Sequence, residues 1–475
     1  MKPPQTLIFA AVCILLILAT ACGNDEPKTQ PISGKVIDAY DKSPVANVIV
    51  KLIENGPSAT TNDDGSFSFS EVALSTGFFE EIDEDGISGV AVFLNRNGYR
   101  PRELNVAYGV HEEIKLTRDS VPAYVYYKPV QLNDGLLTSA MADIGMDRQV
   151  IQNLMDRMYN FEYQEIHSLL VYKDDRLVME EYFYGNNDTI NFENNITVDR
   201  NPAPIQWTRT EPHYIASVNK GLTATLVGIA LDQNDLDTDT KIADYLPKYA
   251  DYFNDSDKAW IDFENCLNMT SGLKWDEWGS NDLALLWQSD DFADFALSRP
   301  SLGPAFEWRY NSALPNILLK AVSQMVGAPV RTWAHDNFYS KLGIHDYKWQ
   351  SQPDGFPEGA ARMYLRPRDM LKIGITYLND GQWKGEQVVP EEWVRSCFSV
   401  KEVTESGDYS YHFWLRSLDG VNYVSLDGDG GNYINIFPDQ NMVIVVTQGN
   451  YLKWPFYVTQ VDNIMKDYIF KSLPQ

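Results

Sequence analysis

Apolar and polar residues alternate with a period of two in the first part of the chain, from residue 31 to about residue 117. Short runs such as 48–53 and 90–94 show this alternation, and turn residues such as Asn62-Asp63-Asp64-Gly65 separate them. Alternation over short, turn-bounded segments is typical of half-buried strands. The pattern predicts an all-β sandwich over residues 31–118, followed by a second domain over residues 119–475.

The second domain mixes strand and helix patterns. Residues 171–183 predict a hairpin that turns at Asp174-Asp175, and the closing runs 433–437 and 442–447 predict two more strands. Helical patterns lie between them, at residues 220–231, 314–325 and 367–377. Strands at both ends with helices between them predict an α/β (α+β) domain, in which an antiparallel sheet carries a helical subdomain.

The N-terminus has the pattern of a targeting segment. Lys2 precedes an apolar run over residues 7–18, and Ala19-Thr20-Ala21 leads to Cys22. The run is too short for a membrane span, and small residues before a cysteine resemble a bacterial lipoprotein signal. The resemblance implies a signal peptide over 1–21, a lipid on Cys22, a tether over 22–30 and an outer-membrane location, on the periplasmic face or the cell surface. An uncleaved anchor is the alternative.

Charge and composition narrow the class of protein. The chain of 475 residues has 39 basic and 66 acidic residues, which gives a formal net charge of −27. Nucleic acids and anionic lipid surfaces require basic patches, so neither is an expected partner. A hydrophobic content of 44% and twelve tryptophans indicate a globular protein of two or three domains.

Cysteines and histidines give little sign of metal chemistry. Cys13 lies in the predicted signal, so Cys266 and Cys397 remain. An exported compartment would permit a disulfide between them, but two unpaired buried thiols are the preferred interpretation. The six histidines are scattered, with no pair at i+2 to i+4, so we expect no zinc site and no cofactor.

Ser217 and Lys220 are the strongest candidates for chemistry. They stand three residues apart at the start of a small-residue apolar run, and residues i and i+3 of a helix share one face. A buried amine beside a hydroxyl can act as a base and make serine a nucleophile. The same spacing recurs at Ser271 and Lys274, where turn residues follow instead of a helical pattern. The alternative for Ser217 is a helix-capping serine with a surface lysine.

Two further segments can complete such a site. Tyr310 lies on a predicted loop before a helix, where its phenol could carry a proton, although most tyrosines are structural. Asp427-Gly428-Asp429-Gly430-Gly431-Asn432 precedes a strand, and Gly430 and Gly431 let backbone N–H groups approach a substrate closely. An acidic turn or a calcium loop is the alternative for this segment, although it lacks the ligand spacing of an EF-hand.

Together these segments resemble the serine β-lactamase and penicillin-binding-protein superfamily, in its class C-like branch of esterases and aminohexanoate-dimer hydrolases. Supporting segments are residues 166–171, 237–247, 268–273, 367–370 and 378–383. The resemblance implies that Ser217 is acylated, that Lys220 activates it and that Tyr310 passes a proton to the leaving group. It also implies that Ser312 takes the third place of the tyrosine motif and that the backbone N–H groups of Ser217 and Asn432 form the oxyanion hole. Whether Lys220 or Tyr310 is the acylation base stays open.

The first domain resembles a carboxypeptidase regulatory-like domain. The matching segments are residues 32–38, 44–48, 60–67 and 97–99, whereas residues 75–89 depart from the usual spacing. This resemblance implies a transthyretin-like fold without catalysis, with a spacer role preferred over carbohydrate binding.

One departure from the superfamily affects the expected substrate. Asp429 stands where the superfamily has lysine or histidine, and Ser312 stands where it often has asparagine. An ionised Asp429 would repel a substrate carboxylate, by about 1–4 kcal/mol at 4 Å, and would raise the pKa of Tyr310 if it were close. We therefore expect weak β-lactam turnover and a preference for neutral or cationic esters or amides.

The sequence thus predicts an envelope-anchored serine hydrolase that cleaves small ester, amide or peptide substrates through an acyl-enzyme on Ser217. Two alternatives remain. One is a non-catalytic surface lipoprotein that binds or scaffolds, with Asp429 marking the loss of activity. The other is a D-alanyl peptidase of the cell wall, which would need a carboxylate-binding cation.

Overall fold

The chain divides into two compact units, Met1–Pro122 and Ala123–Gln475. The computed structural model describes every residue except 1–28, 40–41, 53–56, 74–88, 100, 110, 119–123, 160–161, 193–195, 202–203, 255–256, 305–306 and 475. The predicted signal peptide, Cys22 and the predicted irregular stretch over 75–88 lie outside the described residues.

Strands make up the first unit. Within its described part they form a sheet of order β4-β1-β7 and a sheet of order β3-β2-β5-β6. Their bounds are β1 (Thr29–Asp38), β2 (Ile49–Leu52), β3 (Ser58–Thr60), β4 (Ser66–Ala73), β5 (Gly89–Asn95), β6 (Arg102–Ala107) and β7 (His111–Leu116). Inward residues such as Val36, Val50 and Val92 are fully buried in one apolar cluster, as the alternating pattern requires. The transthyretin-like arrangement stays a prediction.

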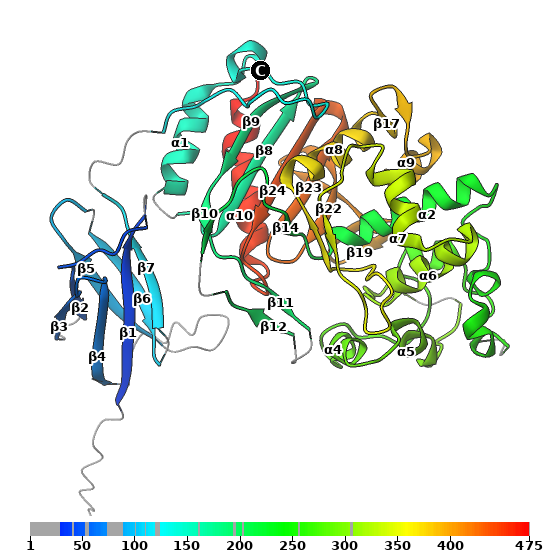
Figure 1. The fold of residues 1–475 in the computed structure, drawn as a ribbon, viewed down its shortest axis with the longest axis horizontal. Helices are drawn as coiled ribbons and strands as arrows, with labels where there is room; N and C mark the ends of the chain where they lie inside the picture. Colours follow the sequence, from blue (N-terminus) through cyan, green and yellow to red (C-terminus); the bar gives the residue numbers. More distant parts are fainter. Residues whose placement is uncertain are drawn as a thin grey trace, which may run out of the picture. The chain divides into compact units, whose positions relative to one another are not determined.

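An eight-stranded sheet is the centre of the second unit, and its neighbouring strands run antiparallel. In spatial order the strands are β19 (Glu402–Thr404), β20 (Gly407–Ser410), β21 (Phe413–Leu418), β22 (Val421–Gly428), β23 (Asn432–Phe437), β24 (Met442–Gln448), β8 (Ile166–Lys173) and β9 (Arg176–Tyr182). The predicted hairpin is β8–β9, with Asp174 and Asp175 at positive φ in its turn. Because β24 pairs with β8, strands from the first and last parts of the unit lie side by side, near the β9 edge of the sheet (Figure 1).

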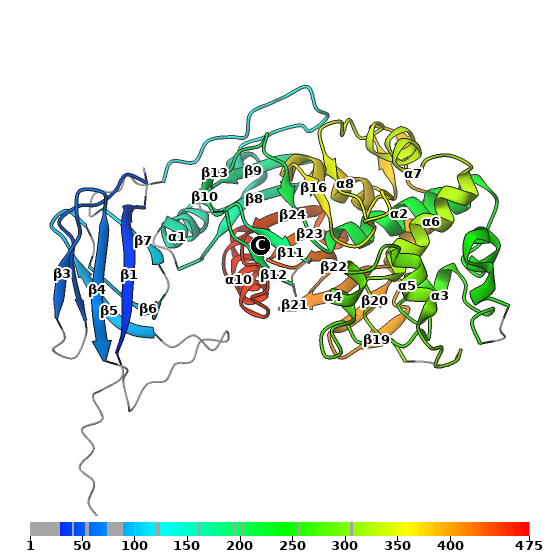
Figure 2. The same ribbon diagram turned by 60° about the horizontal axis from the view of Figure 1, so that its bottom comes forward.

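Helices cover both faces of this sheet (Figure 1, Figure 2). On one face α1 and α10 enclose an apolar cluster with Leu169, Phe437 and Ile444, and on the other face α8 and α2 enclose a larger cluster. Helix α6 packs on α2 and carries α3, α5 and α7 beside it. The bounds are α1 (Arg148–Tyr159), α2 (Val218–Gln233), α3 (Phe263–Leu267), α4 (Asp282–Trp287), α5 (Phe292–Ser298), α6 (Leu314–Val326), α7 (Val330–Ala334), α8 (Pro367–Leu378), α9 (Glu391–Cys397), α10 (Phe456–Ile464) and α11 (Phe470–Ser472).

Short elements complete the unit. The short strands are β10 (Tyr184–Gly185), β11 (Thr189–Asn191), β12 (Thr197–Asp199), β13 (Ile205–Gln206), β14 (His213–Tyr214), β15 (Lys348–Trp349), β16 (Met363–Leu365), β17 (Gln382–Trp383) and β18 (Glu386–Gln387). Single helical turns are η1 (Met141–Ile144), η2 (Ile242–Tyr245), η3 (Pro247–Tyr252), η4 (His335–Tyr339), η5 (Pro438–Gln440) and η6 (Met465–Ile469). The turn predicted between the last two strands is η5.

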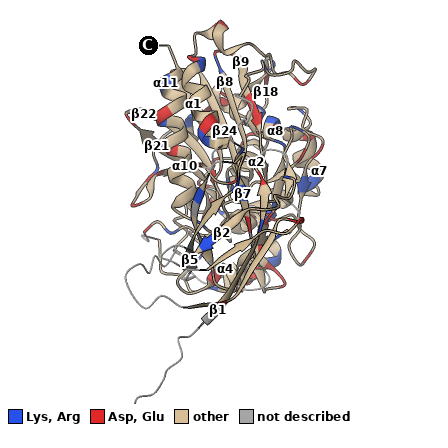
Figure 3. Cartoon of the chain, turned by 90° about the vertical axis from the view of Figure 1, so that its left-hand side faces the viewer, with Lys and Arg blue, Asp and Glu red and all other residues tan. Residues whose placement is uncertain are grey.

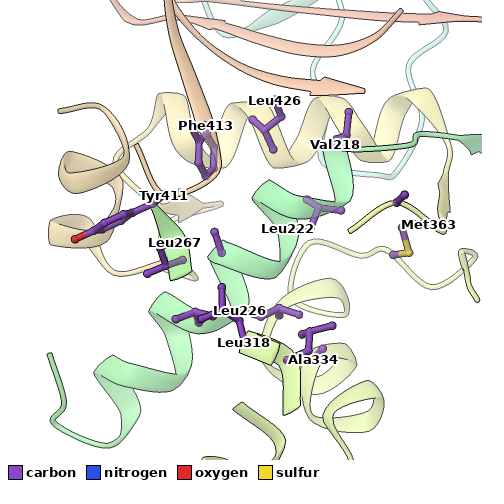
Figure 4. Packing of buried hydrophobic residues seen from close by; sticks show 14 of the residues in the cluster. Val218, Leu222, Leu226, Leu267, Leu318, Ala334, Met363, Tyr411, Phe413 and Leu426 are labelled. Atoms are coloured by element: carbon purple, nitrogen blue, oxygen red, sulfur yellow. The ribbon is translucent and has the colours of Figure 1, made fainter. Parts of the chain in front are cut away.

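Helix α2 is buried on all sides. Every residue from Val218 to Leu231 is buried, and side chains of α6, α7, β21 and β22 surround the helix (Figure 4). A Cβ on Gly228 would lie 2.2 Å from the Trp393 ring, so glycine lets α2 lie directly against α9. An apolar run without a polar face is what such a position requires.

The described residues can be examined for disulfides, metal-ligand clusters and membrane-spanning helices. Cys266 and Cys397 are buried free thiols, as expected. No group of three or more His, Cys, Asp or Glu side chains in the described part of the chain could hold a metal ion. Among the described residues no helix is both long and apolar enough to span a bilayer.

Lys and Arg are interspersed with Asp and Glu along the visible helices and loops (Figure 3).

Candidate active site

The loop before α2 is fixed from two sides, and this places Ser217 at the start of the helix. Strand β14 pairs with β16, and the Ile215 N–H donates to the Met363 carbonyl at 3.0 Å. On the other side the end of β22 approaches so closely that a Cβ on Gly428 would lie 2.2 Å from the Ile215 carbonyl oxygen. Ala216 takes a positive φ of 46°, a conformation that L-residues rarely adopt.

Ser217 and Lys220 form a hydrogen-bonded pair. The Lys220 Nζ donates to the Ser217 Oγ at 2.8 Å, and the lysine is 2% exposed. The Ser217 side chain makes no capping hydrogen bond to the helix. The geometry therefore differs from that of a capping serine with a surface lysine, the alternative interpretation of the sequence.

The second serine–lysine spacing makes no such pair. Ser271 is buried in a loop, where its Oγ accepts a hydrogen bond from the Leu273 N–H at 3.4 Å. Lys274 is exposed to solvent. The turn chemistry after Ser271 prevents the helical geometry that brings residues i and i+3 together.

Glu358 organises the turn that closes over Lys220. It is 1% exposed and accepts hydrogen bonds from the backbone N–H groups of Ala360, Ala361 and Arg362, and from the Asn316 side chain on α6. The turn presents the Ala360 carbonyl oxygen to the Lys220 Nζ at 3.4 Å. Backbone donors thus hold one buried carboxylate and fix an acceptor beside the lysine.

The Tyr310 ring lies against Lys220. The Lys220 Nζ is 4.8 Å from the centroid of the Tyr310 ring, within the range of a cation–π contact. The ring is half-buried and stacks on Trp414 at 6.4 Å between centroids. No hydrogen bond of the Tyr310 hydroxyl is seen within the described part of the chain, so this group is available to a ligand.

Ser312 is bound to a carboxylate that the sequence interpretation missed. Its backbone N–H donates to the Glu277 Oε2 at 3.1 Å, and its hydroxyl donates to Oε1. The Trp275 Nε1 donates to the same Oε2 at 2.6 Å. Burial raises the pKa of Glu277, while the positive charge of Lys220 acts in the opposite direction.

The glycine segment after β22 is placed by Asp429. The two oxygens of its carboxylate accept hydrogen bonds from the Leu452 N–H at 2.7 Å and the Tyr457 hydroxyl at 3.0 Å. Burial raises the pKa of this carboxyl group. The expectation from the sequence is that an ionised Asp429 would repel a substrate carboxylate. In the structure the hydrogen bonds of this carboxyl group tie the segment to the loop after β24 and to α10.

The glycines of this segment and Asn432 are buried. A Cβ on Gly430 would meet the Tyr451 ring at 2.4 Å, and one on Gly431 would meet Gln448 at 2.5 Å, so both positions need glycine. Asn432 begins β23 opposite Gly428, and its side chain donates to the Asp429 carbonyl at 2.9 Å. Gly428 is the residue of this segment that lies against the loop before Ser217, at the Ile215 carbonyl oxygen.

His412 is a second group near Lys220 that the sequence interpretation treated only as structural. Burial, together with the positive charge of Lys220, lowers the pKa of His412 to about 3, so the ring is neutral. Its Nδ1 lies 3.3 Å from the Tyr409 hydroxyl, and its buried Nε2 has no hydrogen-bond partner in the described part of the chain.

Sequence signals for the missed residues were weak. Glu277 follows Trp275 in the segment after Ser271. The only sequence signal for a role of Glu277 in the site is that it is a glutamate in a stretch that is otherwise aromatic and rich in turn residues. Glu358 stands between Pro357 and Gly359 in a loop without periodicity. Gly428 lies inside the glycine segment, but its contact with Ile215 depends on tertiary structure.

A partly exposed serine paired with a buried lysine at the start of a helix, on a layered fold with one large antiparallel sheet, defines a class of active-site scaffold. The chain belongs to the beta-lactamase family of hydrolases, whose family profile (Beta-lactamase) matches residues 149–455.

Individual relatives agree with this assignment. The 6-aminohexanoate-dimer hydrolase of Paenarthrobacter ureafaciens is 23% identical over 260 residues, which are 49% of this chain and 65% of that protein. The match therefore covers slightly less than two thirds of that relative.

Solved structures show the same fold. A Bacillus anthracis protein, provisionally named a 6-aminohexanoate-dimer hydrolase, superposes with a TM-score of 0.56 at 16% identity, over 74% of this chain and 93% of that one. A penicillin-binding protein of Bacillus halodurans superposes with a TM-score of 0.52 at 17% identity, over 66% of this chain and 99% of that one. At these identities the likeness is one of fold.

Proposed function

We propose that this protein is a serine hydrolase that cleaves ester or amide bonds through an acyl-enzyme on Ser217. The observation that carries the proposal is the 2.8 Å hydrogen bond between the Lys220 Nζ and the Ser217 Oγ, with the lysine buried and the Tyr310 ring centroid 4.8 Å from the Nζ. A serine hydroxyl is a weak nucleophile until an adjacent base removes its proton. Of the two candidate bases, Lys220 contacts the Ser217 Oγ directly, and the Tyr310 ring contacts Lys220.

The reaction follows from these contacts. Lys220 or Tyr310 takes the Ser217 proton as Oγ attacks the substrate carbonyl carbon, and the carbonyl oxygen becomes an oxyanion. Collapse of this intermediate breaks the bond to the leaving group, which receives the proton through Tyr310. Water then attacks the ester on Ser217, with the same groups moving its proton, and frees the serine.

The oxyanion needs two donors, and we assign them to the backbone N–H groups of Ser217 and Asn432. The Ser217 N–H has no hydrogen-bond acceptor within the described part of the chain. The close approach of Gly428 to Ile215 supports the second donor, because it brings the end of β22 and the start of β23 to the serine loop. Preorganised donors of this kind are typically worth 10²–10³-fold in rate each.

The substrates we propose are small neutral or cationic esters, amides or peptides. Asp429 stands where related enzymes have a cation, so the segment offers no counter-charge of its own for a substrate carboxylate. The name of the Paenarthrobacter relative, a hydrolase of 6-aminohexanoate dimers, supports an amide class. Slow penicillin turnover beside faster turnover of p-nitrophenyl butyrate is the expected result. Efficient penicillin hydrolysis that Asp429→Asn leaves unchanged would contradict this preference.

A matched pair of serine variants tests the nucleophile. Fluorophosphonate labelling and p-nitrophenyl butyrate turnover should fall by at least 10³-fold in Ser217→Ala. Ser271→Ala is the control, because Ser271 also stands three residues before a lysine, but it is buried and makes no hydrogen bond to a lysine among the described residues. A folded wild-type protein that is not labelled would instead favour a binding or scaffold role.

We also propose that the protein is an exported lipoprotein of the outer membrane, held by a lipid on Cys22, with the first unit as a carboxypeptidase regulatory-like spacer. The pattern of residues 1–22 and the turn-bounded strands of the first unit support this proposal. Cys22→Ser should abolish incorporation of labelled palmitate and release the protein from the membrane fraction. Membrane retention in that variant would contradict the anchor.

A further inference from the structure

A cavity of about 680 Å³ lies beside strands β21, β22 and β23 and is lined by residues of α10 and η6. The Asn435 Nδ2 on β23 donates to the Met465 Sδ on η6 at 3.4 Å, so η6 lies over this part of the sheet. The described residues that line the cavity do not include Ser217, Lys220 or Tyr310. The cavity is therefore distinct from the candidate active site, and its volume suits a small organic molecule.

Polar side chains of three neighbouring strands form the floor of this cavity. Tyr423 and Asp427 are four residues apart on β22, so they point to the same face of the sheet. Tyr423 pairs with Arg416 on β21, and Asp427 pairs with Tyr433 on β23. Residues paired in this way lie about 4.5–5.5 Å apart at Cβ. Asp427 also forms an ion pair with Arg416, so the charge of this arginine is already matched.

Two buried phenols and one carboxylate of the lining have no partner in the described part of the chain. Tyr423 is 6% exposed and Tyr433 is 5% exposed, and neither hydroxyl makes a hydrogen bond there. Asp462, on α10, makes no side-chain hydrogen bond and no ion pair with any described residue. Buried polar groups normally have partners, so three such groups around one cavity indicate that a ligand supplies them.

The charge of the lining favours a cationic ligand. Its charged residues are one arginine and four aspartates, namely Arg416, Asp408, Asp427, Asp439 and Asp462. The positive charges that act on Asp462 are those of Arg416, which Asp427 pairs, and of Lys466, which does not line the cavity. No group of three or more His, Cys, Asp or Glu side chains among the described residues could hold a metal ion. The cation that fits is therefore an organic one.

We propose that this cavity binds an organic ammonium ion with an apolar chain. The ammonium group donates to the Asp462 carboxylate and to the Tyr433 hydroxyl, and such charge-assisted hydrogen bonds are the strong ones. Aromatic rings in the lining attract the same positive charge. The chain lies against Val458 and Val461, which α10 contributes to the lining. The site does not depend on the proposed acylation of Ser217.

Isothermal titration calorimetry of the full chain with hexylamine at pH 7 tests the proposal. Hexylamine is protonated at this pH, and hexan-1-ol is a neutral probe of the same length. Hexylamine should bind the wild type at least about 10-fold more tightly than hexan-1-ol does, and Asp462→Asn should weaken hexylamine binding at least about 10-fold. Wild type that does not bind hexylamine, or binds the alcohol equally well, would overturn the proposal.

Asp467→Asn is the matched control for Asp462→Asn. Asp467 lies on η6, outside the lining, and pairs with Lys471 at 2.9 Å. Its loss removes the same charge from the same region, and hexylamine affinity should stay within about twofold of wild type. An equal loss of affinity in Asp467→Asn and Asp462→Asn would show a general effect of net charge, and would overturn the proposal.

Tyr433→Phe provides a second route if Asp462→Asn does not fold. It keeps the ring and removes the hydroxyl, so hexylamine should bind about 10-fold more weakly. Unchanged affinity in this folded variant would contradict the site. Hydrolysis of p-nitrophenyl butyrate separates the cavity from the catalytic cleft. Hexylamine that competes with this ester equally well in wild type and Asp462→Asn, and binds both with equal affinity, lies in the cleft and overturns the proposal.

Discussion

Gly428 is the residue at which the sheet touches the serine loop. Any Cβ at this position would lie 2.2 Å from the Ile215 carbonyl oxygen, far inside contact distance, so the loop before Ser217 would have to move. We predict that Gly428→Ala lowers the kcat for p-nitrophenyl butyrate about 10- to 100-fold, because an error of about 1 Å in a reacting group has effects of that order.

Gly420→Ala is the control for Gly428→Ala. Gly420 lies in the β21–β22 turn at a φ of 80°, and a Cβ there would have no atom within 4 Å. Alanine there should lower the melting temperature through backbone strain but leave kcat within about twofold. Equal kcat values for the two variants would contradict the contact between β22 and the serine loop.

His412 should make the stability of the protein depend on pH. Its pKa falls from 6.5 to about 3 on folding. Between these values the unfolded chain binds a proton at this residue and the folded chain does not. The free energy of unfolding should therefore decrease as pH falls through this window, by about 1.4 kcal/mol per pH unit for this residue.

His412→Asn should remove that part of the slope. Asparagine tolerates the φ of 67° at this position and can still accept from the Tyr409 hydroxyl. Urea titrations at pH 6.5 and pH 4.5 would measure the difference. The variant should lose less stability than wild type over this interval, and an equal loss would show that His412 is protonated in the folded state. His213, whose pKa burial also lowers, remains in both proteins.

At the scale of single residues, the sequence predicted the atoms that can react but little of what holds them. Ser217, Lys220 and Tyr310 stand in short motifs whose local spacing has chemical meaning. Glu277, Glu358 and His412 lie in loops that follow Ser217 by between 50 and 200 residues. The spacing of neighbouring residues in the sequence does not indicate that such distant residues lie together in the fold. The carboxylate of Asp429 illustrates the same limit, since its hydrogen bonds to Leu452 and Tyr457 are tertiary.

At the scale of elements, the turn around Glu358 joins the two helices that form the site. Besides the contacts of its side chain, Glu358 accepts a hydrogen bond at its backbone carbonyl oxygen from the Asn219 side chain on α2, at 2.9 Å. Glu358→Gln replaces one acceptor oxygen by an N–H₂ group that faces backbone donors. We predict a loss of roughly 2–3 kcal/mol in the free energy of unfolding, and slower labelling because the Ala360 carbonyl moves. Urea denaturation measures the first effect.

Glu391→Gln gives the comparison for that prediction. Glu391 is a largely exposed carboxylate in the first turn of α9, paired with Arg395. Its loss should change stability by no more than about 0.5 kcal/mol, as for other exposed pairs. If the two variants were equally stable, the turn would not depend on the Glu358 carboxylate.

Element prediction from the sequence succeeded where the local pattern was strong. The predicted helices at 220–231, 314–325 and 367–377 correspond to α2, α6 and α8, and each differs by only a few residues at its ends. Strands β19 to β21, at one end of the sheet, and the short helices α3 to α5 were missed, because their runs are too short to show a period. The order of the sheet depends on β24 pairing with β8, which closes a long loop that no local signal reveals.

At the scale of the whole molecule, each unit has an apolar core of its own, and all of the candidate site lies in the second unit. We predict that a protein starting at residue 123 folds and hydrolyses p-nitrophenyl butyrate with a kcat/KM within about twofold of the full chain. Calorimetry of the full chain should show a second transition that the shorter protein lacks. A loss of more than 10-fold in kcat/KM would show that the first unit takes part in the site.

Trapping the acyl-enzyme tests most directly whether the reaction passes through Ser217. The protein is mixed with p-nitrophenyl butyrate, quenched in acid within the first turnovers, and its peptides are examined by mass spectrometry. If Ser217 is the nucleophile, one butyryl group should be found on the peptide that contains Ser217, and none in Ser217→Ala. A butyryl group on another residue, or release of p-nitrophenol without any adduct in repeated early quenches, would contradict it.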